Sequence, residues 1–122
     1  MCIRDRFVPH KDTKFKNENH GDVSLVLMLL SIIRLLKPNI LLPATTALGT
    51  VDPLGREKGI LHGANVVMPN LSPVKHRKDY SLYNNKICTG DEAAQCIGCL
   101  ADRMKKIGCE IVTDRGDYKA DI

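Results

Sequence analysis

The chain has 122 residues, 43% of them hydrophobic, and a formal net charge of +4. This length suffices for one domain with a hydrophobic core. The modest charge comes without a long basic face interleaved with aromatic residues. It therefore disfavours a nucleic-acid partner and favours a solvated surface that can still accept an anionic ligand.

The chain has five cysteines, which is many for this length. An odd count without a signal peptide argues against the disulfide framework of a small secreted protein. We therefore expect reduced thiols in a cytoplasmic protein, available to a metal ion or a cluster. The candidate membrane segment, residues 23–36, is too short to cross a bilayer and includes Arg34. A buried helix is expected there, and no membrane partner.

The N-terminal residues divide into a foreign segment and the end of a strand. Residues 1–6 read like translated sequencing-adapter sequence, so we exclude them, and Cys2 with them, from functional interpretation. Residues 7–9 are predicted to be the last part of a strand, and His10 begins the loop that follows it. This loop is one place where a ligand could be contacted.

The first predicted helix covers residues 23–36. Asp22 can cap its N-terminus. The helix should end before Pro38, because proline disfavours helical backbone in the residue before it.

The centre of the chain is predicted to form a strand, a helix and a second strand. The apolar runs 40–44 and 64–69 are short and continuous, as in parallel strands covered on both faces. Between them Asp52 can cap a helix whose first position suits Pro53, and Gly63 suits the left-handed residue past its end. Such a crossover is what a parallel pair requires.

The predicted fold is therefore α/β, with three strands and two helices in βαβαβ order. Three strands of buried type leave two sheet edges and much apolar surface open. A free-standing sheet of this kind is unfavourable, so we expect the chain to be the C-terminal part of a larger protein with further strands upstream.

The residues after 72 follow a different pattern. Ser72-Pro73 can begin a short helix, and Asn84-Asn85 is expected to form a turn. A longer helix is predicted from about residue 92 to 107, ended by Gly108. A short final strand is predicted over residues 109–113.

The clearest chemical pattern is the cysteine spacing C-x7-C-x2-C, formed by Cys88, Cys96 and Cys99. Cys96 and Cys99 are three apart on the predicted helix, so both thiols should face one side, with Cys88 near the positive N-terminal end. Three thiolates suit an iron–sulfur cluster with one open ligand position, or zinc if Cys109 joins them. The alternative is that these cysteines are small buried residues.

Other candidate residues stand at or beyond the predicted strand ends, where α/β proteins collect their ligand sites. Thr45 and Thr46 could hold a carboxylate, a phosphate or another anion, although threonine is also common in strands and turns. Met68 could contact a flat or metal-bearing ligand, or fill the core. Tyr80 and Tyr83 could reach over a barrel mouth, or pack as half-buried residues.

Six stretches of the sequence resemble one enzyme family, the radical S-adenosylmethionine maturases of iron-iron hydrogenases of the HydE type. The stretches are VPHKDT (8–13), PATTAL (43–48), DPLGRE (52–57), ANVVMPNLSP (64–73), CTGDE (88–92) and TDRGDY (113–118). The resemblance spans about residues 7–119. Biotin synthase and methylornithine synthase are similar relatives that share the barrel, but the cysteine spacing goes with the hydrogenase maturase.

This resemblance implies a (β/α)8 TIM barrel around an internal cavity. Residues 7–72 would supply its last three strands, and residues 73–122 a C-terminal helical cap with the cysteine cluster. The implied reaction is reductive cleavage of S-adenosylmethionine at a site-differentiated 4Fe-4S cluster, giving a 5′-deoxyadenosyl radical. The implied substrate is an organometallic iron–cysteine complex with carbonyl and cyanide ligands, processed toward the H-cluster together with other hydrogenase maturation proteins.

The resemblance also implies roles for five residues near the ligands. Thr45 and Thr46 would line the cavity and bind anions. Met68, Tyr80 and Tyr83 would lie near S-adenosylmethionine or the substrate.

It further implies that Val8 and Pro9 border the adenine, and that Cys88, Cys96 and Cys99 hold an auxiliary cluster found in only some members. The C-x3-C-x2-C motif that anchors the radical cluster is absent from this chain. The chain is therefore expected to be an incomplete barrel that is inactive alone. An alternative interpretation is a small non-catalytic iron–sulfur binding module.

Overall fold

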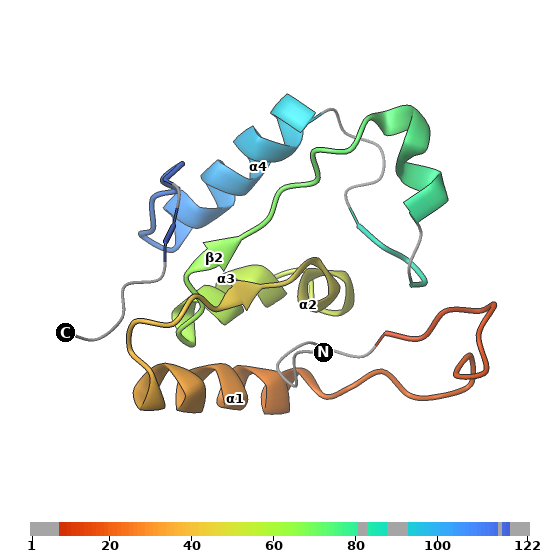
Figure 1. Cartoon of the computed structure of the whole chain (residues 1–122), viewed down its shortest axis with the longest axis horizontal. Coiled ribbons are helices and arrows are strands. Elements are labelled where there is room, and N and C mark those ends of the chain that lie inside the picture. The colour runs from red at the N-terminus through yellow and green to blue at the C-terminus, as the bar shows by residue number, and fades with distance from the viewer. Residues whose placement is uncertain (1–7, 81–82, 88–92, 115, 118–122) are drawn as a thin grey trace.

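The structure is a computed structural model that describes residues 8–80, 83–87, 93–114 and 116–117 (Figure 1). The expectations for residues 1–6, Phe7 and Cys88 fall outside these ranges. The elements are α1 (Val23–Leu36), β1 (Pro43–Ala44), α2 (Thr46–Val51), α3 (Gly55–Leu61), β2 (Val66–Val67), the 3-10 helix η1 (Val74–Tyr80) and α4 (Ala93–Lys106).

The two strands confirm the predicted parallel pair. Pro43 lies opposite Val66 and Ala44 opposite Val67, with α2 and α3 in the crossover between them. The side chain of Asn65 extends the pairing, since its Oδ1 accepts the Leu42 N–H at 2.8 Å. Within the described residues the sheet has two strands, so the fold is α/β but does not itself form a barrel.

Two of the predicted strands are not found among the residues that the structure describes. Val8 and Pro9 have irregular backbone, and so do residues 109–113. A strand is stable only when a neighbour pairs with its main-chain groups, and the described residues provide no such neighbour at either place. The β-branched sequence of residues 109–113 therefore has strand propensity without strand structure.

Helix α1 begins and ends where the sequence predicts. Asp22 caps it, because its Oδ1 accepts the Ser24 N–H at 3.0 Å. Arg34 ties the far end of α1 to the end of α3, since its Nε donates to the carbonyl oxygen of Gly63 at 2.8 Å. Gly63 has φ +103°, which confirms the predicted left-handed position.

The predicted central helix corresponds to α3, which starts later than expected, and a second helix that was not predicted, α2, precedes it. Thr45 caps α2, which ends at Val51, and α3 begins only at Gly55. Asp52 serves both helices: its N–H donates to the Leu48 carbonyl at 3.1 Å, and its Oδ1 accepts the Leu54 N–H at 2.9 Å. The predicted capping role of Asp52 is borne out only in part, because the N-cap residue of α3 is Leu54 and Asp52 bonds the N–H of that residue. Thr45 directly follows β1 as expected, whereas the start of α2 at Thr46 was not predicted.

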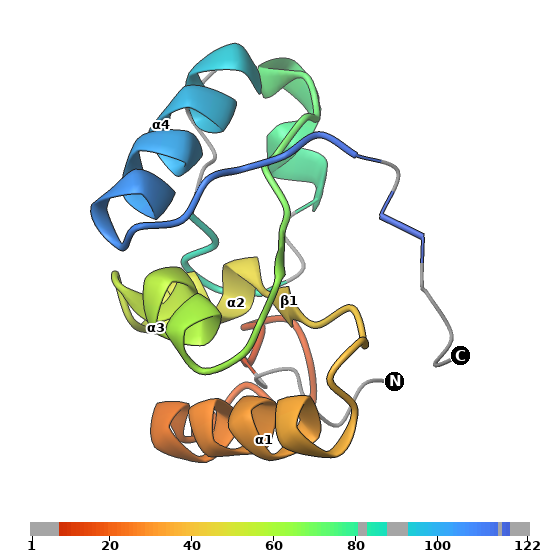
Figure 2. The same ribbon diagram turned by 90° about the vertical axis from the view of Figure 1, so that its left-hand side faces the viewer.

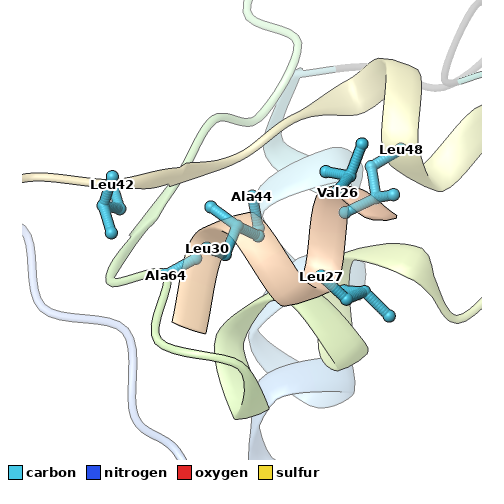
Figure 3. Packing of buried hydrophobic residues seen from close by; sticks show 7 residues of the cluster. All are labelled: Val26, Leu27, Leu30, Leu42, Ala44, Leu48 and Ala64. Carbon is cyan, nitrogen blue, oxygen red and sulfur yellow. The ribbon is translucent and has the colours of Figure 1, made fainter. Parts of the chain in front are cut away.

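The core lies between α1 and the layer made by β1, α2 and α3 (Figure 3). It consists of Val26, Leu27, Leu30, Leu42, Ala44, Leu48 and Ala64. Helix α4 lies on the other side of this layer from α1 (Figures 1 and 2). The opposite face of α1 is also apolar and stays exposed at Leu25, Met28, Ile32, Leu35 and Leu36.

The C-terminal region forms the expected short and long helices. The segment after Pro73 is a 3-10 helix, η1, and the turn at Asn84-Asn85 is present, with Asn85 at φ +58°. Helix α4 ends at Lys106, and Gly108 follows with φ +76°.

Candidate functional site

The candidate ligand residues begin at one edge of the two-stranded sheet. Thr45 directly follows β1 and Met68 directly follows β2. Because Ala44 pairs with Val67 in parallel register, Thr45 and Met68 leave neighbouring strands at the same edge. In Figure 1 both strands run toward the side on which η1 and the loop after residue 8 lie. The structure thus brings these segments, which are distant in sequence, to one end of the fold.

Thr45 and Thr46 are placed by helix α2. The Thr45 hydroxyl oxygen accepts the Leu48 N–H at 3.3 Å, which satisfies one of the first amides of α2. The Thr46 side chain is half-buried at the first position of this helix. Of the predicted anion-binding pair, Thr45 therefore uses its hydroxyl to cap α2, and Thr46 is the next residue along the chain.

Met68, Tyr80 and Tyr83 follow the end of β2. Met68 is 50% exposed and Tyr80 is 59% exposed, whereas Tyr83 is half-buried. The alternative that Met68 fills the core is not supported by this exposure. Tyr80 closes η1, which begins six residues after Met68. All three side chains are thus carried by the connection that leads from β2 toward α4.

Two segments that are far apart in the sequence line an open polar cavity. The Asn84 N–H donates to the Pro9 carbonyl at 3.1 Å, and the Lys11 N–H donates to Asn84 Oδ1 at 3.2 Å. The cavity has a volume of about 650 Å³ and is lined by His10, Lys11, Asp12, Asp79, Tyr83, Asn84 and Asn85. The loop after Val8-Pro9 and the Tyr83 turn, predicted separately as ligand contacts, therefore adjoin one another.

His10 has a defined hydrogen-bonding state in this cavity. The Asp12 N–H donates to His10 Nδ1 at 3.1 Å. In the neutral imidazole Nδ1 is then the acceptor, and Nε2 carries the proton. His10 therefore can donate a hydrogen bond from Nε2.

The two described cysteines of the C-x7-C-x2-C pattern differ in environment. Cys96 is 4% exposed, and its Sγ accepts the Asn70 N–H at 3.4 Å, while Cys99 is exposed. Both residues lie on α4, three positions apart as expected, and in the contacts described the Asn70 loop bonds to Cys96. That both thiols hold one metal or cluster stays a prediction. Cys88 lies outside the described residues. Among the residues described, no three His, Cys, Asp or Glu side chains converge closely enough to hold a metal ion.

Two buried arginines were not singled out by sequence reasoning. Arg77 is 2% exposed; its Nε donates to the Ser72 carbonyl at 2.8 Å and its Nη2 to the Asn70 carbonyl at 3.2 Å. Arg56, in α3, is equally buried. Their sequence gives no signal of burial, since arginine is a surface residue in most contexts.

An ion pair joins α3 to α4. Two nitrogens of the Arg103 guanidinium donate to Glu57: Nε to Oε1, and Nη2 to Oε2 at 2.7 Å. Nη2 also donates to the Pro53 carbonyl. Burial alone would raise the pKa of Glu57. The hydrogen bonds from Arg103 and the charges of Arg103 and Arg56 outweigh burial, so the pKa of Glu57 lies below its ordinary value. This pair is a structural contact and stands apart from the strand-end residues.

Comparison with known proteins gives one informative match. No family model matches the chain. The chain is 42% identical over 113 residues to the [FeFe] hydrogenase maturase subunit HydE of Thermotoga maritima. The resemblance to HydE-type maturases is confirmed. The match covers 93% of this chain and 32% of that protein, so the chain spans about a third of the length of the curated relative it matches.

The described residues contain no helix with the length and hydrophobicity needed to cross a membrane.

Proposed function

We propose that the chain is the C-terminal part of a radical S-adenosylmethionine enzyme that matures the active site of an iron-iron hydrogenase. The observation that carries this proposal is the 42% identity to the HydE maturase, which extends over 93% of the chain. The parallel strand pair with its helical crossover supports it, because such units build α/β barrels. Residues 7–72 would contribute the last barrel units, and residues 73–122 the C-terminal cap.

The strand edge supplies the proposed ligand contacts. Thr45 and Thr46 would hold an anionic group of the substrate, an iron–cysteine complex with carbonyl and cyanide ligands. Met68, Tyr80 and Tyr83 would surround S-adenosylmethionine or this substrate. The position of Thr45 and Met68 directly after β1 and β2 supports these roles, since ligands of parallel sheets bind at that edge. Tyr80 and Tyr83 follow on the connection from β2 to α4.

Val8 and Pro9 would border the adenine of S-adenosylmethionine. The hydrogen bond from Asn84 to Pro9 supports this, because it sets the Val8-Pro9 segment beside the turn that carries Tyr83. S-adenosylmethionine, when bound with a 4Fe-4S cluster held elsewhere in the enzyme, supplies a 5′-deoxyadenosyl radical. The residues of this chain would orient both ligands and exclude water, and the reaction would proceed in the reducing cytoplasm with other maturation proteins as partners.

Cys88, Cys96 and Cys99 would hold an auxiliary iron–sulfur cluster. The environment of Cys96 fits a cluster ligand, because a main-chain N–H already donates to its sulfur, and such hydrogen bonds stabilise ligating thiolates. The exposure of Cys99 fits a cluster at the protein surface.

The function is tested by a chimera in which the matching 113 residues of the Thermotoga maritima maturase are replaced by those of this chain. We expect the chimera to support hydrogenase activation. In it, Thr46→Val should reduce activation about tenfold, the equivalent of one lost hydrogen bond to a charged group. Thr50→Val, on the same helix and bonded only to the Thr46 carbonyl in the contacts described, is the matched control. A folded chimera that fails to support activation would contradict the proposal.

The auxiliary cluster is tested on the chain itself by anaerobic reconstitution with iron and sulfide. We expect a brown charge-transfer absorption that Cys96→Ala and Cys99→Ala each abolish. Cys109→Ala is the control, since Cys109 is a half-buried cysteine outside the pattern. Unchanged spectra in the two α4 variants would exclude the auxiliary site.

A further inference from the structure

The connection from β2 to α4 contains a buried arginine, Arg77, that bonds to main-chain carbonyl oxygens. Arg77, in η1, reaches back along the chain, and its Nε and Nη2 donate to the carbonyl oxygens of Ser72 and Asn70 at 2.8 and 3.2 Å. With 2% of its surface exposed, Arg77 makes these bonds away from water. Hydrogen bonds from a charged donor in a buried setting are stronger than those between neutral groups. The two bonds therefore close residues 70–77 into one loop.

Asn70 joins this loop to the neighbouring helix. Its carbonyl accepts from Arg77, its N–H donates to Cys96 Sγ of α4 at 3.4 Å, and its side-chain Oδ1 accepts the Ser72 N–H at 3.2 Å. Figures 1 and 2 both place η1 at the end of the fold where α4 begins. The loop is thus fixed on one side by η1 and on the other by α4.

The loop lies between two candidate ligand residues. Met68 is two residues before Asn70, and Tyr80 is three residues after Arg77. In a 3-10 helix, side chains at positions i and i+3 lie on the same edge, so Arg77 and Tyr80 share one edge of η1. The contacts that hold Arg77 therefore also set where the Tyr80 backbone stands relative to the end of β2.

We propose that Arg77 is a positioning residue that, through Asn70, fixes Tyr80 and Met68 in one arrangement at the strand edge. That Met68 and Tyr80 face a ligand rests on the proposed function; the positioning itself rests on the hydrogen bonds of Arg77. The guanidinium geometry is required, because a lysine ammonium on a longer flexible stem cannot serve both carbonyls in the same fixed fork.

The test compares amide resonances of the ¹⁵N-labelled full chain with Arg77→Lys, Arg77→Met and the control Lys75→Met, which changes an exposed residue of η1. We expect both Arg77 variants to shift the amide resonances of Met68, Asn70 and Tyr80 together and to leave those of α1 in place. Lys75→Met should shift only its sequence neighbours. If Arg77→Met unfolds the chain, Arg77→Lys, which keeps the charge, gives the answer.

A lower melting temperature in Arg77→Lys with unchanged resonances of Met68 and Asn70 in the folded state would show a purely stabilising role and overturn the proposal. Shifts confined to residues 74–80 would overturn it as well. Either of these results would overturn the positioning role of Arg77 without bearing on the proposed function. A failure of the proposed function would instead appear as a chimera that retains Arg77 but does not support hydrogenase activation.

Discussion

Gly55→Ala is expected to lower the stability of the chain by about 3 kcal/mol, because an added methyl group has no space. A Cβ at Gly55 would lie 2.3 Å from the carbonyl oxygen of Leu48, a main-chain atom. That oxygen already accepts the Asp52 N–H, so it cannot shift without breaking the end of α2. In a thermal melt the midpoint should fall by roughly 10 °C.

Gly98→Ala is the matched control for this variant. Gly98 lies inside α4, and a Cβ there would meet nothing within 4 Å. Alanine is a better helix former than glycine, so this variant should gain about 0.5–1 kcal/mol. If Gly55→Ala and Gly98→Ala melted alike, the close contact between α2 and α3 would be wrong.

Arg103→Met is expected to cost about 3 kcal/mol at neutral pH, because it leaves the Glu57 carboxylate buried without its guanidinium. Glu57 is 7% exposed, whereas the Arg103 side chain remains a quarter exposed, which places the expected cost at the low end for a buried pair. Urea unfolding measures it. The double variant Arg103→Met with Glu57→Met should recover part of the loss, since it removes the stranded charge as well.

The pH dependence of the same pair has a defined sign. In the parent chain the pKa of Glu57 lies below its ordinary value of 4.5, so the pair stabilises the fold above that pH, and the contribution is lost as the pH falls through the lower folded pKa. In Arg103→Met the hydrogen bonds and charge of Arg103 are lost, while burial, the main-chain hydrogen bond and the charge of Arg56 remain, so the pKa of Glu57 rises relative to the parent. The stability difference between parent and variant should therefore shrink as the pH falls below about 4.5, toward the lower folded pKa of Glu57 in the parent. A difference independent of pH would contradict the role given to Glu57.

Local sequence signals predicted the elements that local chemistry determines. The bounds of α1 follow from the Asp22 cap and from Pro38, and the helix ends at Gly63 and Gly108 follow from backbone that only glycine adopts readily. The parallel pairing followed from two continuous apolar runs with a helix between them. These features need no information about distant residues.

The features that depend on distant residues were not predictable in the same way. Threonine and valine in residues 45–51 have strand and turn propensity, yet the chain forms α2 there, where Ala47 and Leu48 become buried. Residues 109–113 have strand propensity but no pairing neighbour among the described residues. The pairing of Arg103 with Glu57 arises only when segments 46 residues apart in the sequence meet.

In the candidate site, too, some features follow from the local sequence and others require contacts between distant residues. The placement of Thr45 and Met68 at one sheet edge follows from strand order alone, and the structure confirms it. That Thr45 caps α2, that Cys96 bonds the Asn70 amide and that Asn84 bonds Pro9 required the folded chain. The ligand roles of these residues stay predictions that the variants above test.

The central claim is that this chain is part of a radical S-adenosylmethionine maturase, and a longer read of the source DNA upstream of the Phe7 codon tests it most directly. We predict that the reading frame continues without interruption into further strand–helix units and a C-x3-C-x2-C motif. A stop codon in that frame, directly followed by a start site near Met1, would contradict the claim and leave the cysteines of α4 as the chemistry to be explained.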